Sequence, residues 1–207
     1  MILLKSSREI EHMRAAGRIL AEVKARLKAL VRPGASTKDI DEDIEAFIVG
    51  KGAAPAFKGY RGYPRSICVS VNEEVVHGIP GPRRLKAGDL VSLDFGVKYQ
   101  GYYGDAAITV GVGEVGEKAR ALMAATEKSL YAGIAEVKAG KRLSDISHAV
   151  QTVVEGAGFG VIREFVGHGI GRAFHTEPQV PHIGKRGRAL RLRAGMVFTI
   201  EPMINAG

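Results

Sequence analysis

The spacing of apolar residues predicts two helices followed by short strands in the first half of the chain. Apolar side chains recur every three or four residues along 10–30 and again along 40–48, which indicates two amphipathic helices. The segment Ser6-Ser7-Arg8-Glu9 has the form of a capping box before the first helix, and Ser36-Thr37 precede the second. After Gly52 the pattern changes to short β-like runs separated by glycine and proline; these runs are 66–71, 90–95 and 106–112.

The same order of elements returns in the second half. Helical spacing resumes at Glu117 and continues in a further helix near 143–155. Strand-like stretches follow at 161–166 and 196–204. Helices followed by strands in each half predict an α+β protein.

The two halves also share sequence at a nearly constant offset. Val31-Arg32-Pro33-Gly34 aligns with Val137-Lys138-Ala139-Gly140 at an offset of 106. Leu85-Lys86-Ala87-Gly88 aligns with Leu192-Arg193-Ala194-Gly195 at an offset of 107. A register held within one residue over this span indicates an internal repeat of two related α+β units.

The repeat makes a prediction about two acidic residues. A single domain of residues 1–207 would contain one half at about 1–112 and a second at about 113–207. The offset of 107 sets Asp94 against Glu201, each after an apolar run. Two halves packed around a pseudo-two-fold axis would bring these carboxylates together, whereas the alternative is that each is a solvated acid at a strand end.

Composition excludes several classes of protein. The chain has 207 residues, 45% of them hydrophobic, and 30 Lys+Arg against 22 Asp+Glu give a net charge of +8. The single cysteine, Cys68, excludes a disulfide framework and a thiolate zinc finger. No apolar stretch approaches the ~18 residues needed to span a bilayer. Only four residues precede the first charges, Lys5 and Arg8, and no signal peptide is visible, so we expect a cytoplasmic protein without a membrane segment.

Two aspartates in the first half suggest a cation site. Asp94 and Asp105 are eleven positions apart with Gly96, Gly101 and Gly104 between them, which predicts a hairpin that returns the chain beside its start. Two neighbouring buried carboxylates repel each other unless one is protonated or a cation lies between them. Bridging carboxylates are ligands that a pair of divalent ions uses.

Three histidines lie outside the predicted helices and beside glycine or an aromatic residue. His168 stands between Gly167 and Gly169, and flanking glycines allow a close approach of the backbone. His175 follows Phe174, and His77 precedes a glycine. These three are the candidate functional histidines.

Other features favour structural interpretations. His12 and His148 lie on predicted helices, and for His182 the sequence leaves the choice open, with a surface position favoured. The segment 111–116 matches G-x-G-x-x-G, but no parallel strand and acidic residue follow as a dinucleotide site requires. The basic segment 185–193 is typical of a solvated hairpin, with docking to an anionic partner such as RNA as the alternative.

Four motifs taken together resemble the type I methionine aminopeptidase family: His77-Gly78-Ile79-Pro80, Asp94 with Asp105, the Gly167–Gly171 segment, and Thr199-Ile200-Glu201-Pro202-Met203. The likeness covers nearly the whole chain. It implies the pita-bread fold, an α+β fold with a curved antiparallel sheet covered by helices and a pseudo-two-fold internal repeat.

The resemblance also implies a metal site and a reaction. The family's metal ligands fall on Asp94, Asp105, His168 and Glu201. Oxygen ligands with one imidazole suit two divalent ions of cobalt, manganese, iron or zinc. The implied reaction is removal of the initiator methionine from nascent chains with a small second residue. We expect such an enzyme to be a cytoplasmic monomer that acts on nascent N-termini. For the basic segment 185–193, contact with the ribosome is the alternative to a solvated hairpin.

The resemblance assigns roles to further residues. Glu201 corresponds to the family's proton shuttle between the attacking water and the leaving amine. His175 would donate to the carbonyl oxygen, and His77 would contact the scissile amide or leaving nitrogen. The methionine pocket falls on Tyr60, Tyr63, Cys68 and Phe174.

One ligand of the family has no counterpart in this sequence. The family's fifth ligand is a bridging glutamate beyond the Glu-Pro-Met motif, and no acidic residue follows Glu201 here. We therefore expect the second half to lack its closing hairpin, as in a fragment or truncated form, with weakened metal binding. The alternatives are a proline-specific peptidase of the same fold and a non-catalytic module that binds peptide or RNA.

Overall fold

The computed structural model describes residues 2–206, which divide into two units. The N-terminal unit is Glu11–Gly116, and the C-terminal unit comprises the described residues up to Ile10 and from Glu117 onward. The N-terminal unit contains most of α1 (Ser7–Leu30), and α2 (Thr37–Gly50), β1 (Ala54–Pro55), a 3₁₀ turn (Tyr60–Gly62), β2 (Ile67–Val71), β3 (Leu90–Tyr99) and β4 (Tyr102–Gly111). The C-terminal unit contains α3 (Glu117–Ala135), α4 (Leu143–Gly156), β5 (Gly160–Val161), β6 (Gly167–Gly169), β7 (Thr176–Val180) and β8 (Ile204–Asn205).

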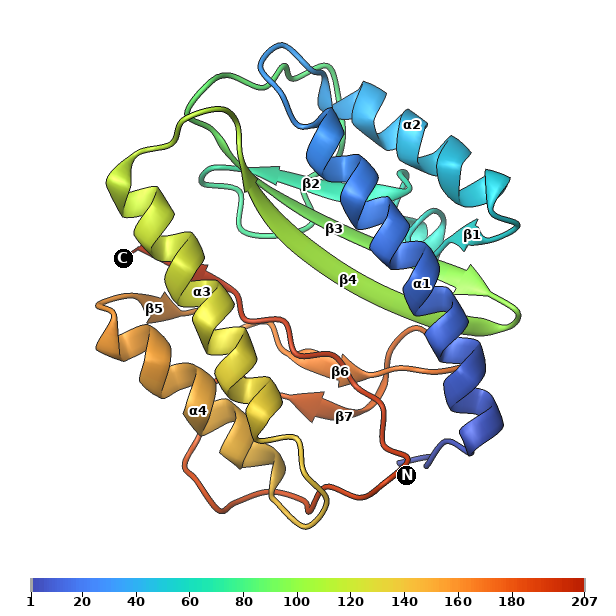
Figure 1. Cartoon of the computed structure of the whole chain (residues 1–207), viewed down its shortest axis with the longest axis vertical. Helices are drawn as coiled ribbons and strands as arrows, with labels where there is room; N and C mark the ends of the chain where they lie inside the picture. The colour runs from blue at the N-terminus through green and yellow to red at the C-terminus, as the bar shows by residue number, and fades with distance from the viewer. Residues whose placement is uncertain (1, 207) are drawn as a thin grey trace. The chain divides into compact units, whose positions relative to one another are not determined.

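The sheet of the N-terminal unit is built around β3. One edge of β3 pairs with β4 over its whole length, and the other edge pairs with β2 and then with β1 (Figure 1). All of these pairs are antiparallel. The predicted strands 90–95 and 106–112 are therefore the two arms of one longer hairpin, Leu90–Gly111. Because no parallel strand accompanies it in the part of the chain described, the dinucleotide-binding alternative loses its structural basis.

The predicted starts of α1 and α2 are confirmed. The Ser6 hydroxyl accepts from the Glu9 amide at 3.3 Å, while the Ser6 amide donates to Glu9 Oε2 at 2.9 Å, which completes the capping box of α1. The Ser36 hydroxyl caps α2 by accepting from the Asp39 amide at 3.1 Å.

The helices α1 and α2 cover one face of this sheet (Figure 1). Along β3, the alternate residues Val91, Leu93 and Phe95 are fully buried against them. The period of two in a strand sends Ser92 and Asp94 to the opposite face. The sheet therefore separates the apolar core from the face that carries the acidic side chain.

In the C-terminal unit, α3 and α4 lie side by side (Figure 1). Their approach is close because Gly133 has no side chain; a Cβ there would be 2.9 Å from Val150 and 3.3 Å from Ile146. A small core joins α4 to β7 and the following segment, through Leu143, Ile146, Val180 and Leu192. The strands form two antiparallel pairs, β5 with β8 and β6 with β7.

Equivalent hydrogen bonds in the two units confirm the internal repeat. The Gly34 amide donates to the Leu85 carbonyl at 2.8 Å, and the Gly140 amide donates to the Leu192 carbonyl at 2.9 Å. These pairs are related by the offsets of 106 and 107 found in the sequence. The helices that follow, α2 and α4, have 14 residues each.

Strand pairs in the two units are related by the same offsets. Ala54 pairs with Lys98 in the N-terminal unit, and Gly160 pairs with Asn205 in the C-terminal unit. The offset of 107 that relates Lys98 to Asn205 also relates Asp94 to Glu201. The two acids thus occupy equivalent positions in the two units, as the repeat predicted.

Two predicted strands of the second half are wrong in extent. The range 161–166 contains only the end of β5, and an exposed turn at Arg163–Phe165 separates it from β6. In the range 196–204 only Ile204 belongs to a strand, and Phe198 makes an isolated bridge with Gly169. Pro202 has no N–H for a ladder, which helps explain why the segment around it stays irregular.

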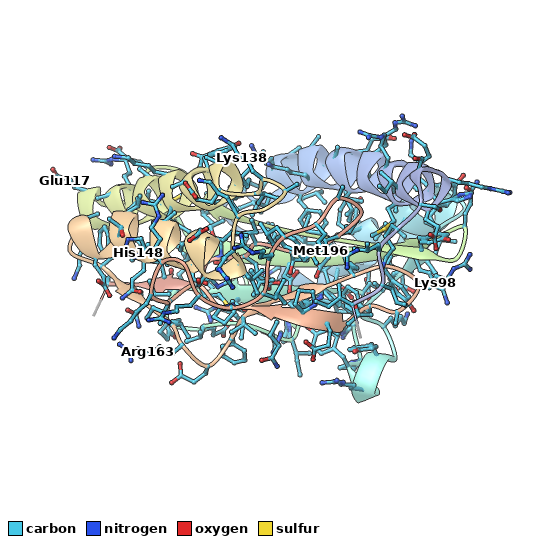
Figure 2. All side chains as sticks on the ribbon, turned by 90° about the horizontal axis from the view of Figure 1, so that it is seen from below. Lys98, Glu117, Lys138, His148, Arg163 and Met196 are labelled. Atoms are coloured by element: carbon cyan, nitrogen blue, oxygen red, sulfur yellow. The ribbon has the colours of Figure 1, made fainter. Side chains whose placement is uncertain are left out.

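The surface carries many charged side chains, among them Lys138 and Arg163 (Figure 2). Within residues 2–206 there is no helix with the length and apolar character required to cross a membrane.

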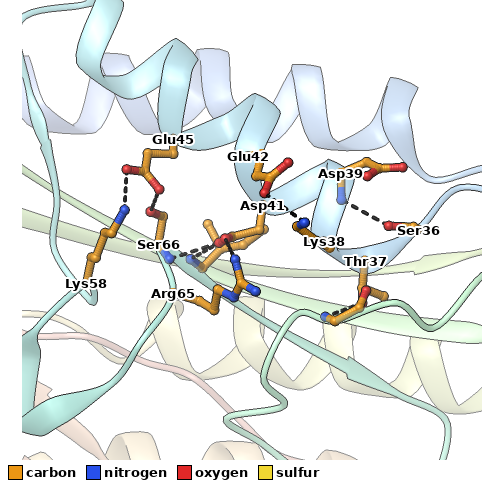
Figure 3. A network of polar contacts seen from close by, with 12 residues as sticks. Ser36, Thr37, Lys38, Asp39, Asp41, Glu42, Glu45, Lys58, Arg65 and Ser66 are labelled. Carbon is orange, nitrogen blue, oxygen red and sulfur yellow. Dashed lines mark hydrogen bonds and ion pairs between the residues drawn. The ribbon is translucent and has the colours of Figure 1, made fainter.

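A polar network joins α2 to the segment before β2 (Figure 3). Asp41, which is 1% exposed, accepts from the backbone amides of Ser66 at 2.9 Å and Ile67 at 3.0 Å. Glu45, one turn further along the helix, accepts from the Ser66 hydroxyl at 2.7 Å and pairs with Lys58. The network holds the start of β2 against the helix, immediately after the turn that contains Tyr60 and Tyr63.

Replacing Asp41 should therefore destabilise the protein. Asp41→Ala leaves two amides in a buried place without their acceptor, and we expect a loss of about 3 kcal/mol in the free energy of unfolding. Urea unfolding followed by circular dichroism measures it. The matched control is Glu42→Ala on the same helix, whose exposed pair with Lys38 should contribute less than about 0.5 kcal/mol. Equal losses in the two variants would contradict the anchoring role.

Candidate metal centre

The β3–β4 hairpin places two carboxylates on one face of the sheet. Asp94 is opposite Ala107 and Asp105 is opposite Gly96, so the two aspartates are diagonal neighbours on the face away from α1 and α2. Diagonal positions lie within reach of each other's side chains. The hairpin predicted from the glycines between Asp94 and Asp105 is confirmed.

Cys68 shares this face, because it is directly opposite Asp94 in the β2–β3 ladder. Its side chain is 3% exposed. Burial raises the pKa of the Cys68 thiol to about 12, a hydrogen bond with Tyr63 opposes the rise, and the charges of Asp94 and Asp105 add to it. Cys68 is therefore a protonated thiol beside the two carboxylates at neutral pH.

Tyr63 lies beside Cys68. Its hydroxyl lies 2.9 Å from the Gly78 carbonyl and 3.1 Å from the Ile67 carbonyl, to which it can donate. Its ring meets that of Phe57 edge-on at 6.3 Å between centroids. Burial raises the pKa of Tyr63, so the hydroxyl stays a donor. Tyr60, three residues earlier, is half-buried at the start of the 3₁₀ turn.

The loop that carries His77 is tied to β2. The Val69 amide donates to the Gly78 carbonyl at 2.9 Å, and the Gly78 amide donates to the Ser70 hydroxyl at 3.0 Å. A Cβ at Gly78 would lie 2.2 Å from the Val69 carbonyl oxygen, so only glycine allows this approach. His77 itself has a φ of 59° and an exposed side chain. The His-Gly motif thus presents an imidazole beside the strand that carries Cys68.

In the C-terminal unit, the glycines around His168 also allow a close approach of neighbouring backbone. A Cβ at Gly167 would lie 2.4 Å from the Thr199 carbonyl oxygen, and one at Gly169 would lie 2.1 Å from the Glu177 carbonyl oxygen. Neighbouring backbone therefore closes on both sides of His168, whose residue is 7% exposed. The predicted close approach of the backbone is confirmed. The segments that approach His168 are those that contain Thr199 and Glu177.

The hydrogen bond of the His168 ring leaves one ring nitrogen directed at Glu201. Nδ1 is 3.0 Å from the Gly169 carbonyl oxygen, which favours a proton on Nδ1. Nε2 is then the acceptor atom of the ring, and it lies 3.6 Å from Oε1 of Glu201. An imidazole nitrogen and a carboxylate oxygen that converge in this way fit a divalent ion. The rings of Phe174 and His175 pack around His168, with centroids 6.0 and 4.0 Å away.

Two residues that had no role in the site predicted from the sequence contact this pair. The Thr199 hydroxyl accepts from the His168 amide at 2.9 Å and donates to Glu201 Oε1. The Glu201 amide donates to Nε2 of His182 at 3.1 Å. Both side chains lie between segments far apart in sequence, so only the tertiary structure brings them together.

The surface position favoured for His182 is wrong, since this residue is 2% exposed. Burial lowers the pKa of His182 to about 4, so the ring is neutral at physiological pH. A signal was present in the sequence: Pro178, Val180 and His182 alternate with polar or exposed residues at the period of a strand, and all three are buried. By contrast, His148 is exposed on α4 (Figure 2), and His12 stacks on Tyr102 at 5.3 Å between centroids.

Each unit thus supplies part of the predicted ligand set. The N-terminal unit presents Asp94 and Asp105 on one sheet face, and the C-terminal unit presents His168 with Glu201. Oxygen donors with one imidazole fit the divalent ions named above. That all four surround one pair of ions, with Asp94 and Glu201 face to face, stays a prediction.

Known proteins resemble the whole chain. The profile of metallopeptidase family M24 matches residues 11–207. Methionine aminopeptidase 1 of Bacillus subtilis is 54% identical over 207 residues, which are all of this chain and 84% of that protein. The methionine aminopeptidase of Clostridium perfringens is 51% identical over the same length and is covered to 83%.

Solved structures agree. The crystal structure of methionine aminopeptidase from Rickettsia prowazekii superposes with a TM-score of 0.99 at 40% identity, over all of this chain and 84% of that one. The prolidase of Pyrococcus horikoshii shares the fold with a TM-score of 0.83 at 25% identity, but only 56% of its chain is covered.

These findings confirm the pita-bread α+β fold and an enzyme of the aminopeptidase class, and the higher identities favour methionine aminopeptidases over the proline-specific alternative. On the match of residues 11–207 and the relatives above, the chain belongs to metallopeptidase family M24.

Proposed function

We propose that this protein removes the N-terminal methionine from newly made proteins, with a preference for a small second residue, by metal-dependent hydrolysis. Membership of a metallopeptidase family and the names of the relatives that span the whole chain support this activity. The observation that carries it to particular residues is the pair formed by His168 Nε2 and Glu201 Oε1, 3.6 Å apart.

We assign the metal site to Asp94, Asp105, His168 and Glu201. Two divalent ions held there would supply an activated water and a Lewis acid for the scissile carbonyl. The donor set of carboxylate oxygens and one imidazole suits cobalt, manganese, iron(II) or zinc. The Nδ1 contact of His168 with the Gly169 carbonyl, and the Thr199 contact with Glu201, would hold two of the ligands in place.

Three side chains would handle protons and the substrate. Glu201 would accept a proton from the attacking water and pass it to the leaving amine. His175, exposed beside the buried His168, would donate to the carbonyl oxygen as negative charge develops there. His77, exposed on its tied loop, would contact the scissile amide or the leaving nitrogen.

The pocket for the methionine side chain would be formed by Tyr60, Tyr63, Cys68 and Phe174. The contact of Tyr63 with Cys68 supports this grouping in the N-terminal unit. Because Cys68 pairs with Asp94 in the sheet, the pocket would adjoin a metal ligand, which suits an enzyme that acts at the first residue. A thioether packs favourably against aromatic rings and a thiol.

We further propose that the protein acts in the cytoplasm, as a monomer, on the N-termini of nascent chains. The segment 185–193 carries exposed basic side chains at Lys185, Arg186 and Arg188, and the whole chain has a net charge of +8. Such a segment would favour contact with ribosomal RNA.

A peptide assay tests the activity. The purified chain, with Co²⁺, Mn²⁺, Fe²⁺ or Zn²⁺ titrated in, should release methionine from Met-Ala and Met-Gly peptides and leave Xaa-Pro dipeptides intact. Free methionine is measured by chromatography. No release with any of these ions, under conditions in which the Bacillus subtilis relative is active, would contradict the proposal, and cleavage of Xaa-Pro dipeptides would favour the proline-specific alternative.

Two variants separate metal binding from substrate contact. Asp105→Asn removes a charged ligand, and we expect metal affinity to fall by more than the ~10–100-fold typical of outer-shell changes, with loss of activity. His77→Ala should keep metal affinity and lower kcat by about 100-fold, because it removes a group that acts on the substrate. Titration calorimetry with Mn²⁺ and steady-state kinetics measure both. A loss of metal in His77→Ala would show that its assigned role is wrong.

The environment of Cys68 predicts an unreactive thiol. With its pKa raised to about 12, Cys68 has a thiolate fraction at pH 8 about a thousandfold below that of an ordinary cysteine. A thiol reagent at pH 8 should therefore label the folded chain at least that much more slowly than the urea-unfolded chain. Rapid labelling of the folded protein would show that Cys68 is not enclosed beside Tyr63.

A further inference from the structure

An imidazole holds the backbone of Glu201. The Glu201 amide donates to Nε2 of His182 at 3.1 Å, and His182 is almost completely buried, just after the end of β7. Most buried amides donate to a carbonyl oxygen of the main chain, so an imidazole acceptor at this position is unusual.

The equivalent residue in the N-terminal unit is held differently. Asp94 lies in the middle of β3 and is flanked by Cys68 of β2 and Ala107 of β4. Its main chain is therefore fixed by strands on both sides. Glu201 lies outside every strand of residues 2–206, between the bridge at Phe198 and β8. The His182 ring supplies the acceptor that a neighbouring strand would otherwise provide.

The hydrogen bond from the Glu201 amide requires a tautomer of His182 that leaves one ring donor unsatisfied. Nε2 can accept only when the proton of the neutral ring is on Nδ1. Nδ1 of His182 is buried and has no hydrogen-bond partner among residues 2–206. An apolar ring of similar size would remove that unsatisfied donor, although it would leave the Glu201 amide without its acceptor. The presence of a histidine here therefore calls for an explanation other than packing.

The helix α4 fixes the position of His182 from both sides. The Ser147 hydroxyl donates to the carbonyl oxygen of Pro181, the residue before His182. The Gly184 amide, two residues after it, donates to Gln151 Oε1 at 3.0 Å. Ser147 and Gln151 are one turn apart on α4, so the helix presents the imidazole to Glu201 as a fixed acceptor.

We propose that His182 is a positioning residue for Glu201, which orients the carboxylate toward His168 through the backbone while Thr199 orients it through the side chain. This inference rests on the proposed function, since it assumes that Glu201 binds metal. The predicted chain of contacts runs from α4 through His182 to the ligand, and it would preorganise the site before metal arrives.

A nuclear magnetic resonance measurement tests the contact without metal. In the ¹⁵N-labelled 207-residue chain, we expect a scalar coupling across the hydrogen bond between the Glu201 amide nitrogen and His182 Nε2. The ¹⁵N shifts of the ring should be those of the neutral Nδ1–H tautomer. The other neutral tautomer, or an exposed ring in rapid exchange, would overturn the proposal even if substituted proteins do not fold.

Substitutions test the consequence for metal. His182→Phe keeps a ring but removes the acceptor, and we expect Mn²⁺ affinity to fall about 10–100-fold. Thermal stability should change little, because the variant exchanges the unsatisfied Nδ1–H of the ring for an unsatisfied Glu201 amide. His182→Gln places an acceptor near the position of Nε2 and should recover most of that affinity. The matched control is Val180→Ala at the end of β7, two residues before His182, which should lower the melting temperature and leave Mn²⁺ affinity unchanged.

The outcomes separate this inference from the proposed function. Wild-type Mn²⁺ affinity in a folded His182→Phe protein would overturn the positioning role. A parallel loss of affinity in Val180→Ala would do so too, because any disturbance of the strand would then suffice. A wild-type chain that binds Mn²⁺ but releases no methionine would contradict the proposed activity alone, because the coupling and the affinities do not depend on turnover.

Discussion

The pairing of β3 with β4 is the interaction on which the N-terminal unit depends. Ten consecutive residues of Leu90–Tyr99 pair with Tyr102–Gly111, and this ladder sets which side chains face the helices and which face away. A slip of one residue would move Asp94 into the apolar core and Phe95 out of it. The same register makes Asp94 and Asp105 diagonal neighbours and places Cys68 opposite Asp94. The register of β3 with β4 therefore determines the core of this unit and the places of Asp94, Asp105 and Cys68.

The C-terminal unit holds its candidate ligands by a different kind of contact. It repeats the helices, the turn hydrogen bonds and the short strand pairing of its partner half, but it has no long hairpin among the described residues. Its candidate ligands His168 and Glu201 are fixed by side chains, through Thr199 and His182. Main-chain ladders tolerate many substitutions because every residue has the same backbone, whereas a side-chain contact requires a particular residue. The second half of the repeat should therefore be the more sensitive to substitution around its ligands.

The structure explains why three positions near the candidate site require glycine. At Gly78, Gly167 and Gly169, a Cβ would lie within 2.5 Å of a carbonyl oxygen of a neighbouring segment. All three adjoin a candidate histidine, His77 or His168. Backbone packed this closely leaves little freedom for the imidazole between the glycines, which is what a preorganised site needs. The glycines thus act on the site through the rigidity of the neighbouring main chain.

The amino-acid sequence by itself determined the features that depend on local spacing. The helix starts at Ser6 and Ser36, the hairpin between Asp94 and Asp105, and the internal repeat all follow from residues close in sequence or from a constant offset. Comparison with a known family then supplied roles for those residues. Only the tertiary structure decided the contact of His182 with the Glu201 amide, the irregular course of 199–203 and the contact of Thr199 with His168. These contacts join residues 19 and 31 positions apart, and no periodic pattern encodes which distant backbone group a buried side chain will meet.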